Sequence, residues 1–209
     1  MERKTKQIMV GGVAIGGGAP LAIQSMANTK TTDVEATLCQ LHRLKEAGCH
    51  VARLTVPDEK AARAFGRIRR DSPLPLVADI HFDYKAAIWA AEEGADKIRI
   101  NPGNIGSDEK VGEVVRACRK HNIPIRIGVN GGSLEKDILA KYGAPTAEAL
   151  VESAMSHVEK LHRCENQHCR LPADGGKDRL SPPSGGHRGG HPVYGHPEIG
   201  GGLRGAAAG

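Results

Sequence analysis

Aromatic side chains are scarce in this sequence, since only 3% of its 209 residues are Phe, Trp or Tyr. Few rings are therefore available for stacking on bases, and no motif of an RNA- or DNA-binding module occurs, so we expect no nucleic-acid partner. No apolar run approaches membrane-spanning length, and the segment after Met1 forms no signal-peptide core. These absences predict a soluble, cytoplasmic protein with no membrane partner.

Nucleotide-loop motifs are also missing. The Gly-rich segment 10–18 has no strand–glycine–helix context of a dinucleotide-binding loop, and no Gly-Lys-Ser/Thr follows it. We favour a small β-hairpin that caps a barrel. The five cysteines are an odd number, and three of them lie within helical or strand patterns, which indicates reduced thiols rather than a disulfide framework. The modest net charge of +5 suits an acidic small molecule.

Short apolar strands alternate with amphipathic helical patterns through three quarters of the chain. The expected strands cover 21–26, 50–56, 75–80, 97–100 and 123–129. Strands separated by helices form a parallel sheet that is covered by helices. An open doubly wound sheet and a β/α barrel both fit this pattern. Because no dinucleotide fingerprint is present and polar residues follow almost every strand, we favour the barrel.

The stretch 97–106 shows the pattern most clearly. A strand leads into the turn residues Asn-Pro-Gly-Asn, and Ser107 then begins a helix. This arrangement predicts that Arg99 and Asn101 lie beside a tight loop whose free N–H groups suit an anion such as phosphate.

Polar residues at the strand ends are the candidate binding groups. In a barrel every strand directs its carboxyl end to the same face, so these groups converge on one mouth. Three arginines there would suit a diphosphate, because guanidinium groups bind phosphate oxygens in pairs. The simpler alternative is that each arginine pairs with an internal carboxylate. The candidates are Arg53, Asp79, His81, Arg99, Asn101, Arg126 and Asn130.

Two clusters have several interpretations. Asp79 and His81 could form an acid/base pair, a metal pair or an orienting hydrogen bond, and we favour substrate positioning because a metal site needs a third ligand. Cys164 and Cys169, with His162 and His168 nearby, match no standard zinc spacing, so we assign them no metal.

The composition changes near residue 163. The segment 164–209 holds twelve Gly and five Pro in 46 residues, and only six large apolar residues. Such a segment cannot bury enough apolar surface to offset its ordering entropy, which predicts disorder. We therefore divide the chain into 1–163, a partial TIM-type β/α barrel with about five of eight βα units, and 164–209, a low-complexity tail.

Five runs within the first part resemble one enzyme family over about residues 5–163. They are APLAIQSM (19–26), TTDVEAT (31–37), VADIHFDY (77–84), RINPGNIG (99–106) and IPIRIGVNGGSLEKD (123–137), and ESAM (152–155) continues the pattern. In these runs the chain is similar to 4-hydroxy-3-methylbut-2-en-1-yl diphosphate synthase, a bacterial oxidoreductase of non-mevalonate isoprenoid biosynthesis.

The resemblance implies a TIM barrel that binds 2-C-methyl-D-erythritol 2,4-cyclodiphosphate. The family opens this cyclic diphosphate and removes a hydroxyl with two electrons, which flavodoxin or ferredoxin delivers through a [4Fe–4S] cluster. Arg53, Arg99 and Arg126 fall on family positions that hold the diphosphate. Asp79, His81, Asn101 and Asn130 fall on positions that line the same pocket.

The sequence departs from the family after this region. The family holds its cluster in a C-terminal domain with a Cys-Pro-x-Cys motif, a further Cys and a Glu, and its dimers close that domain over the partner's barrel. This chain lacks the motif, so we expect no catalysis by it alone. We hypothesise a truncated or frameshifted member, which genomic DNA with the family pattern in another frame would support.

Two other functions were weighed. A non-catalytic remnant that binds diphosphates is the main alternative. A different barrel enzyme, such as a pterin-binding transferase or an aldolase, ranks below it, because the sole lysine near a predicted strand, Lys97, lies at that strand's start and not at its carboxyl end.

Overall fold

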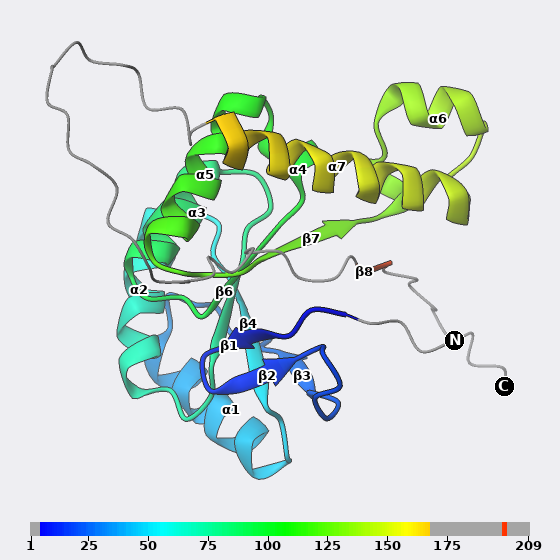
Figure 1. Cartoon of the computed structure of the whole chain (residues 1–209). Coiled ribbons are helices and arrows are strands. Elements are labelled where there is room, and N and C mark those ends of the chain that lie inside the picture. Colours follow the sequence, from blue (N-terminus) through cyan, green and yellow to red (C-terminus); the bar gives the residue numbers. More distant parts are fainter. Residues whose placement is uncertain (1–4, 168–197, 200–209) are drawn as a thin grey trace, which may run out of the picture.

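A computed structural model describes residues 5–167 and 198–199 of the chain. Its main sheet is parallel, and its first five strands are neighbours in chain order (Figure 1). They are β3 (Gln24–Met26), β4 (Val51–Thr55), β5 (Leu76–Asp79), β6 (Lys97–Ile100) and β7 (Ile125–Val129). A doubly wound sheet reverses its strand order at a switch point, whereas a barrel proceeds around in one direction. The prediction of a partial β/α barrel with five strands is therefore confirmed.

Helices fill the connections between the strands and continue after β7. They are α1 (Val34–Glu46), α2 (Glu59–Asp71), α3 (Tyr84–Glu92), α4 (Pro102–Ile105), α5 (Asp108–Lys120), α6 (Lys136–Tyr142) and α7 (Ala147–Gln167), with a 3₁₀ turn, η1, at Gly131–Ser133. The first three begin at aspartates, because Asp33, Asp58 and Asp83 each accept a hydrogen bond from a backbone N–H of the first turn. Local capping thus fixes where these three helices start.

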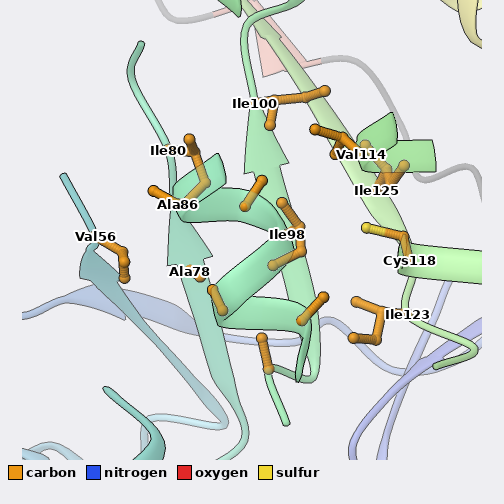
Figure 2. Close-up of a cluster of buried hydrophobic side chains, with 14 of the residues drawn as sticks. Val56, Ala78, Ile80, Ala86, Ile98, Ile100, Val114, Cys118, Ile123 and Ile125 are labelled. Carbon is orange, nitrogen blue, oxygen red and sulfur yellow. The ribbon is translucent and has the colours of Figure 1, made fainter. Parts of the chain in front are cut away.

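The main core lies between the sheet and the helices. Ile98 and Ile100 of β6 are fully buried there and face the helical layer, together with Ala78 and Ile80 from β5 and its end (Figure 2). The buried face of α3 consists of alanines, which allow close packing against α2 and α5. This layer supplies the hydrophobic stabilisation of the half-barrel.

A β-hairpin covers the amino-terminal ends of the strands. Strands β1 (Ile8–Val10) and β2 (Val13–Ile15) pair antiparallel, as expected from segment 10–18. Val10 is fully buried and packs with Val51 and Val77, near the starts of β4 and β5. The hairpin thus packs against the amino-terminal ends of β4 and β5, away from the carboxyl ends that carry the predicted binding residues.

The final helix continues past the boundary that we placed at residue 163. α7 extends to Gln167, and Cys164 on it is buried. Strand β8 (Glu198–Ile199) pairs parallel with Gly128 and Val129 of β7. The predicted disorder of 164–209 otherwise concerns residues that lie outside the described part. Among the described helices, none has both the length and the apolar character that crossing a membrane requires.

Candidate functional site

One face of the sheet is polar, and we call it the inner face because it lies opposite the helical core. Successive residues of a strand point to opposite sides. Lys97 and Arg99 of β6 therefore share the inner face, while Ile98 and Ile100 enter the core. Arg99 is in register with Asp79 on one neighbouring strand and with Arg126 on the other, so these charged side chains share a face.

Asp79 is the centre of this charged group. Its side chain is only 3% exposed, and its carboxylate accepts a hydrogen bond of 3.0 Å from Nη1 of Arg99. Nε of Arg53 lies 3.5 Å from the other carboxylate oxygen, and Nε2 of His81 lies 3.9 Å from that oxygen. The structure thus brings four of the seven predicted residues together around one buried carboxylate. Internal pairing of the arginines, the simpler alternative, does occur for Arg53 and Arg99.

Arg126 adds a third guanidinium to the group, and it is 8% exposed. The pKa of Arg126 is lowered to about 10, mainly by burial and also by repulsion from Arg53 and Arg99, while the charge of Asp79 acts in the opposite direction. Repulsion of this kind acts where cations lie close to one another. Among the described residues of this group, three guanidinium groups share the inner face with one carboxylate, so an incoming anion would reduce their mutual repulsion.

Gly128 provides the space that Arg99 occupies. A β-carbon at this position would collide with the guanidinium of Arg99, in particular with its Nη2 and Nε atoms. Gly128 follows Arg126 by two residues on β7, so it lies on the inner face. The absence of a side chain there allows Arg99 to lie across the strand and reach Asp79.

Asn101 lies beside a tight loop, as the sequence predicted, but it binds the N–H groups that we expected to be free. It is 2% exposed and caps α4, where its Oδ1 accepts a hydrogen bond of 3.1 Å from the N–H of Gly103. Its Nδ2 donates to Oγ of Ser133 at 2.6 Å. The N–H groups of Asn104 and Ile105 donate to the carbonyl of Asn101. The expected free N–H groups are thus occupied at these three positions, because an Asn at the N-cap satisfies the first turn itself.

Asn130 and His81 are the more accessible members of the predicted set. Asn130 is exposed directly after β7, and its carbonyl accepts a hydrogen bond of 3.1 Å from the N–H of Ser133. The side chain of His81 is 42% exposed beyond the end of β5. Both therefore lie at the carboxyl end of the sheet, where a ligand can reach them.

Sequence reasoning missed a buried cluster behind this loop. Oγ of Ser153 donates to Glu135 at 2.7 Å, and Nε2 of His157 lies 2.8 Å from the other oxygen of Glu135. Burial lowers the pKa of His157, although Glu135 partly offsets this. The cluster attaches the segment after β7 to α7. The spacing of four residues between Ser153 and His157 on one helix was the available signal.

Lys97 was also missed as a site residue. It is the first residue of β6, it lies on the inner face, and it is 5% exposed. The pKa of Lys97 is lowered to about 8, mainly by burial and also by repulsion from Arg126 and Arg53. The sequence position at the start of a strand hid this burial, because only the assembled sheet encloses it.

Metal-binding groups do not gather in the described residues, where no three of His, Cys, Asp and Glu are close enough to hold an ion. Cys39 is exposed, while Cys49, Cys118 and Cys164 are buried. Burial raises the pKa of the Cys118 thiol to about 12, whereas a metal or cluster ligand must be a thiolate. Within residues 5–167 the thiols are therefore not grouped as an iron–sulfur cluster would require. Cys169 and His168 lie outside the described residues.

Comparison with known proteins identifies relatives of the chain. Residues 5–172 match the model of the GcpE TIM-barrel domain. The chain is 59% identical over 165 residues to the 4-hydroxy-3-methylbut-2-en-1-yl diphosphate synthase (flavodoxin) of Marinobacter nauticus, which covers 79% of this chain and 44% of that protein. It is 56% identical over 171 residues to the enzyme of the same name from Pseudomonas aeruginosa. That alignment covers 82% of this chain and 46% of the relative. The chain thus spans less than half the length of these curated relatives.

Solved structures share the fold at low sequence identity. A DAHP synthase from Thermotoga maritima aligns with a TM-score of 0.54 and 18% identity over 78% of this chain and 44% of that one. The dihydropteroate synthase of Yersinia pestis aligns with a TM-score of 0.52 and 12% identity, over 78% of this chain and 58% of that one. At such identities the likeness shows the β/α fold alone. The family match over residues 5–172, together with the identities above 55%, shows that this chain belongs to the GcpE family and represents its N-terminal TIM-barrel portion.

Proposed function

We propose that the inner face of this half-barrel binds the diphosphate of 2-C-methyl-D-erythritol 2,4-cyclodiphosphate. The observation that supports this proposal is the group of Arg53, Arg99 and Arg126 around a single buried carboxylate, Asp79. Three guanidinium groups exceed the charge of one carboxylate, and planar guanidinium groups suit phosphate oxygens. In this proposal Asp79 orients Arg53 and Arg99 and is not itself a ligand.

The activity that we propose for the whole enzyme is that of the family. It is reductive ring opening and dehydroxylation of the cyclic diphosphate to 4-hydroxy-3-methylbut-2-en-1-yl diphosphate. In this scheme His81 and Asn130 contact the substrate at the carboxyl end of the sheet, since both are accessible there. Asn101 acts through the turn that it caps. The protein would act in the cytoplasm as part of isoprenoid biosynthesis.

The electrons need a separate source. A [4Fe–4S] cluster, as in the family, would pass on the two electrons one at a time, and flavodoxin, which the names of the relatives include, or ferredoxin would reduce it. The described thiols form no site for it. We propose that the described part supplies substrate binding, and that electron transfer depends on residues beyond it, in a homodimer as in the family. A binding role without catalysis is the second candidate, and the same lack of a thiolate cluster in residues 5–167 favours it.

Calorimetric titration of the purified chain with the cyclic diphosphate and with inorganic pyrophosphate tests substrate binding. Arg99→Met should weaken both affinities about ten- to a hundredfold, because a hydrogen bond to a charged group contributes about 1.5–3 kcal/mol. Arg67→Met removes an exposed arginine of α2 and should leave both affinities unchanged. A folded wild-type chain that binds neither compound would refute the proposal.

Catalysis separates the two candidate functions. After anaerobic reconstitution, iron analysis and a product assay with a chemical reductant measure whether the chain holds a cluster and turns over. Binding without iron and without product would favour the non-catalytic role. Stoichiometric iron with product formation would show that cysteines of the chain do ligate a cluster.

A further inference from the structure

A cavity lies at the amino-terminal side of the inner face. It has a volume of about 440 Å³, which falls within the ~300–1,000 Å³ range of small-molecule sites. One side of the cavity is polar, with Gln24, Lys97 and Arg126. The remaining wall comes from the β1–β2 hairpin, the segment that follows it and the start of β4, and it is mainly apolar, with Ile8, Ile15, Pro20, Leu21, Ala22 and Val51.

The ammonium group of Lys97 has little compensation at this place. Its Nζ donates to Oε1 of Gln24 at a long 3.4 Å, and within the described residues no carboxylate forms an ion pair with it. The cations that act on it from other strands are Arg126 on the neighbouring strand β7 and Arg53 on β4, one strand further away on the other side. Asp79 on β5 is already bound by Arg53 and Arg99. The hairpin side of the cavity contributes no charge.

We propose that Lys97 and Arg126 form a second anion subsite, and that the cavity accepts an oxyanion carrying a small apolar group, such as an alkyl phosphate. The oxyanion lies between the ammonium and the guanidinium, and the apolar group contacts Ile8, Ile15 and Leu21. This inference goes beyond the proposed function and shares with it only Arg126.

Electrostatics and cavity shape support the same ligand class. A buried cation without a carboxylate partner is costly, and a bound oxyanion removes that cost. The pKa of Lys97 is lowered to about 8 by burial and by the two arginines, so an anion beside it should raise that pKa again. The cavity exceeds the size of a phosphate group, and its wall has no further charge, which favours an apolar substituent over a second charged one.

Calorimetry with n-butyl phosphate and inorganic phosphate at pH 8 tests the subsite. The wild-type chain should bind n-butyl phosphate more tightly, and it should take up protons, measured in two buffers of different ionisation enthalpy. Lys97→Met should lower the affinity about tenfold or more and abolish the proton uptake. Lys97→Arg should keep most of the affinity without the uptake, because arginine stays charged at this pH.

Two controls separate this site from the proposed substrate site. Arg99→Met should weaken pyrophosphate binding but leave n-butyl phosphate binding intact. Lys120→Met, at an exposed position at the end of α5, should change neither. Circular dichroism and thermal melts establish that each variant is folded, and Lys97→Gln replaces Lys97→Met if the latter is not.

Three results would overturn the inference. They are no binding of n-butyl phosphate by the folded wild type, equal affinity for the two phosphates, and loss of binding in Arg99→Met but not in Lys97→Met. The last result would place the ligand in the Arg53–Asp79–Arg99 group, so the proposed function would survive while this inference failed.

Discussion

The two faces of the sheet have opposite chemistry although the same strands form them. On β6, Ile98 and Ile100 are fully buried against helices. Lys97 and Arg99, which alternate with them along the strand, lie on the charged inner face. In most β/α barrels the interior is packed with branched apolar side chains. Here the helical side provides the hydrophobic stabilisation, and the inner side concentrates charge. Stability and binding are thus separated by the two-residue alternation of a strand.

The comparison also explains the contrast between the two ends of the sheet. At the amino-terminal end, Val10 of the hairpin packs against Val51 and Val77. Toward the carboxyl end, Asp79 gathers Arg53 and Arg99, and accessible groups such as His81 follow. One end is closed by apolar packing and the other presents polar groups to solvent, which is the usual division in this fold.

The largest expected effect comes from the helical face. Ile98→Ala should lower the free energy of unfolding by about 4 kcal/mol, because it removes buried methyl groups and leaves a cavity beneath the helices. Urea unfolding measures the loss, and Met9→Ala, at a 52% exposed position, is the control. A loss below about 1 kcal/mol would contradict the assignment of this face as the main source of stability.

Loss of the carboxylate that Arg53 and Arg99 share should destabilise the inner face. Asp79→Asn should lower the free energy of unfolding by about 3 kcal/mol, because it leaves Arg53 and Arg99 without their buried partner. Saturating pyrophosphate should restore part of that loss, since the ligand replaces the missing negative charge. Urea unfolding with and without pyrophosphate measures both effects.

Asp137→Asn is the matched control, since Asp137 is exposed on α6. Its change should stay within about 0.5 kcal/mol. Equal stability losses in the two variants would mean that Asp79 does not organise the arginines.

The steric role of Gly128 links stability to binding. Gly128→Ala should displace the guanidinium of Arg99, lower the free energy of unfolding by about 2 kcal/mol and weaken pyrophosphate binding roughly tenfold. Gly12→Ala is the control, because no atom lies within 4 Å of a β-carbon placed there. Urea unfolding and calorimetry measure the two effects, and unchanged pyrophosphate affinity would show that the position of Arg99 is unimportant for binding.

The last expected effect is a dependence on pH. The folded chain holds the pKa of Lys97 near 8, below the 10.5 of an ordinary lysine, so above pH 8 the unfolded chain binds more protons. Burying the charged ammonium lowers the free energy of unfolding. This loss is fully present below pH 8 and is relieved as the pH rises to 10.5. Relative to Lys97→Met, the wild type should gain roughly 2–3 kcal/mol in its free energy of unfolding over that range, since each unit of pKa shift corresponds to about 1.4 kcal/mol.

Urea unfolding at intervals between pH 7 and pH 10 measures this difference. Lys120→Met should follow the wild type at every pH, because that lysine is exposed. A wild type that loses stability relative to Lys97→Met as the pH rises would show that the pKa shift has the opposite sign.

Much of the fold was predictable because its signals are local. The aspartates at 33, 58 and 83 start helices through hydrogen bonds to residues two or three positions away. The alternation in Lys97–Ile100 marks a strand whose two sides differ. Family membership was also predictable, because runs such as RINPGNIG and VADIHFDY are long and specific.

The candidate site was less predictable, because its contacts join distant residues. The sequence indicated that Arg53 and Arg99 converge on one mouth of the barrel, but not that Asp79, on the strand between theirs, binds both. It predicted free N–H groups after Asn101, whereas the side chain of Asn101 and its carbonyl occupy them. The contact between Glu135, directly before α6, and His157 on α7 joins residues far apart in the sequence. Only the four-residue spacing of Ser153 and His157 indicated it.

The sequence by itself determined the order of strands and helices, the caps, the hairpin and the family, because periodicity and turn chemistry act over a few residues. Only the tertiary structure decided the electrostatics of the inner face. Parallel pairing places Arg99 between Asp79 and Arg126, and the hairpin encloses Lys97. Charge interactions depend on distance and burial, and both are fixed only when the strands assemble.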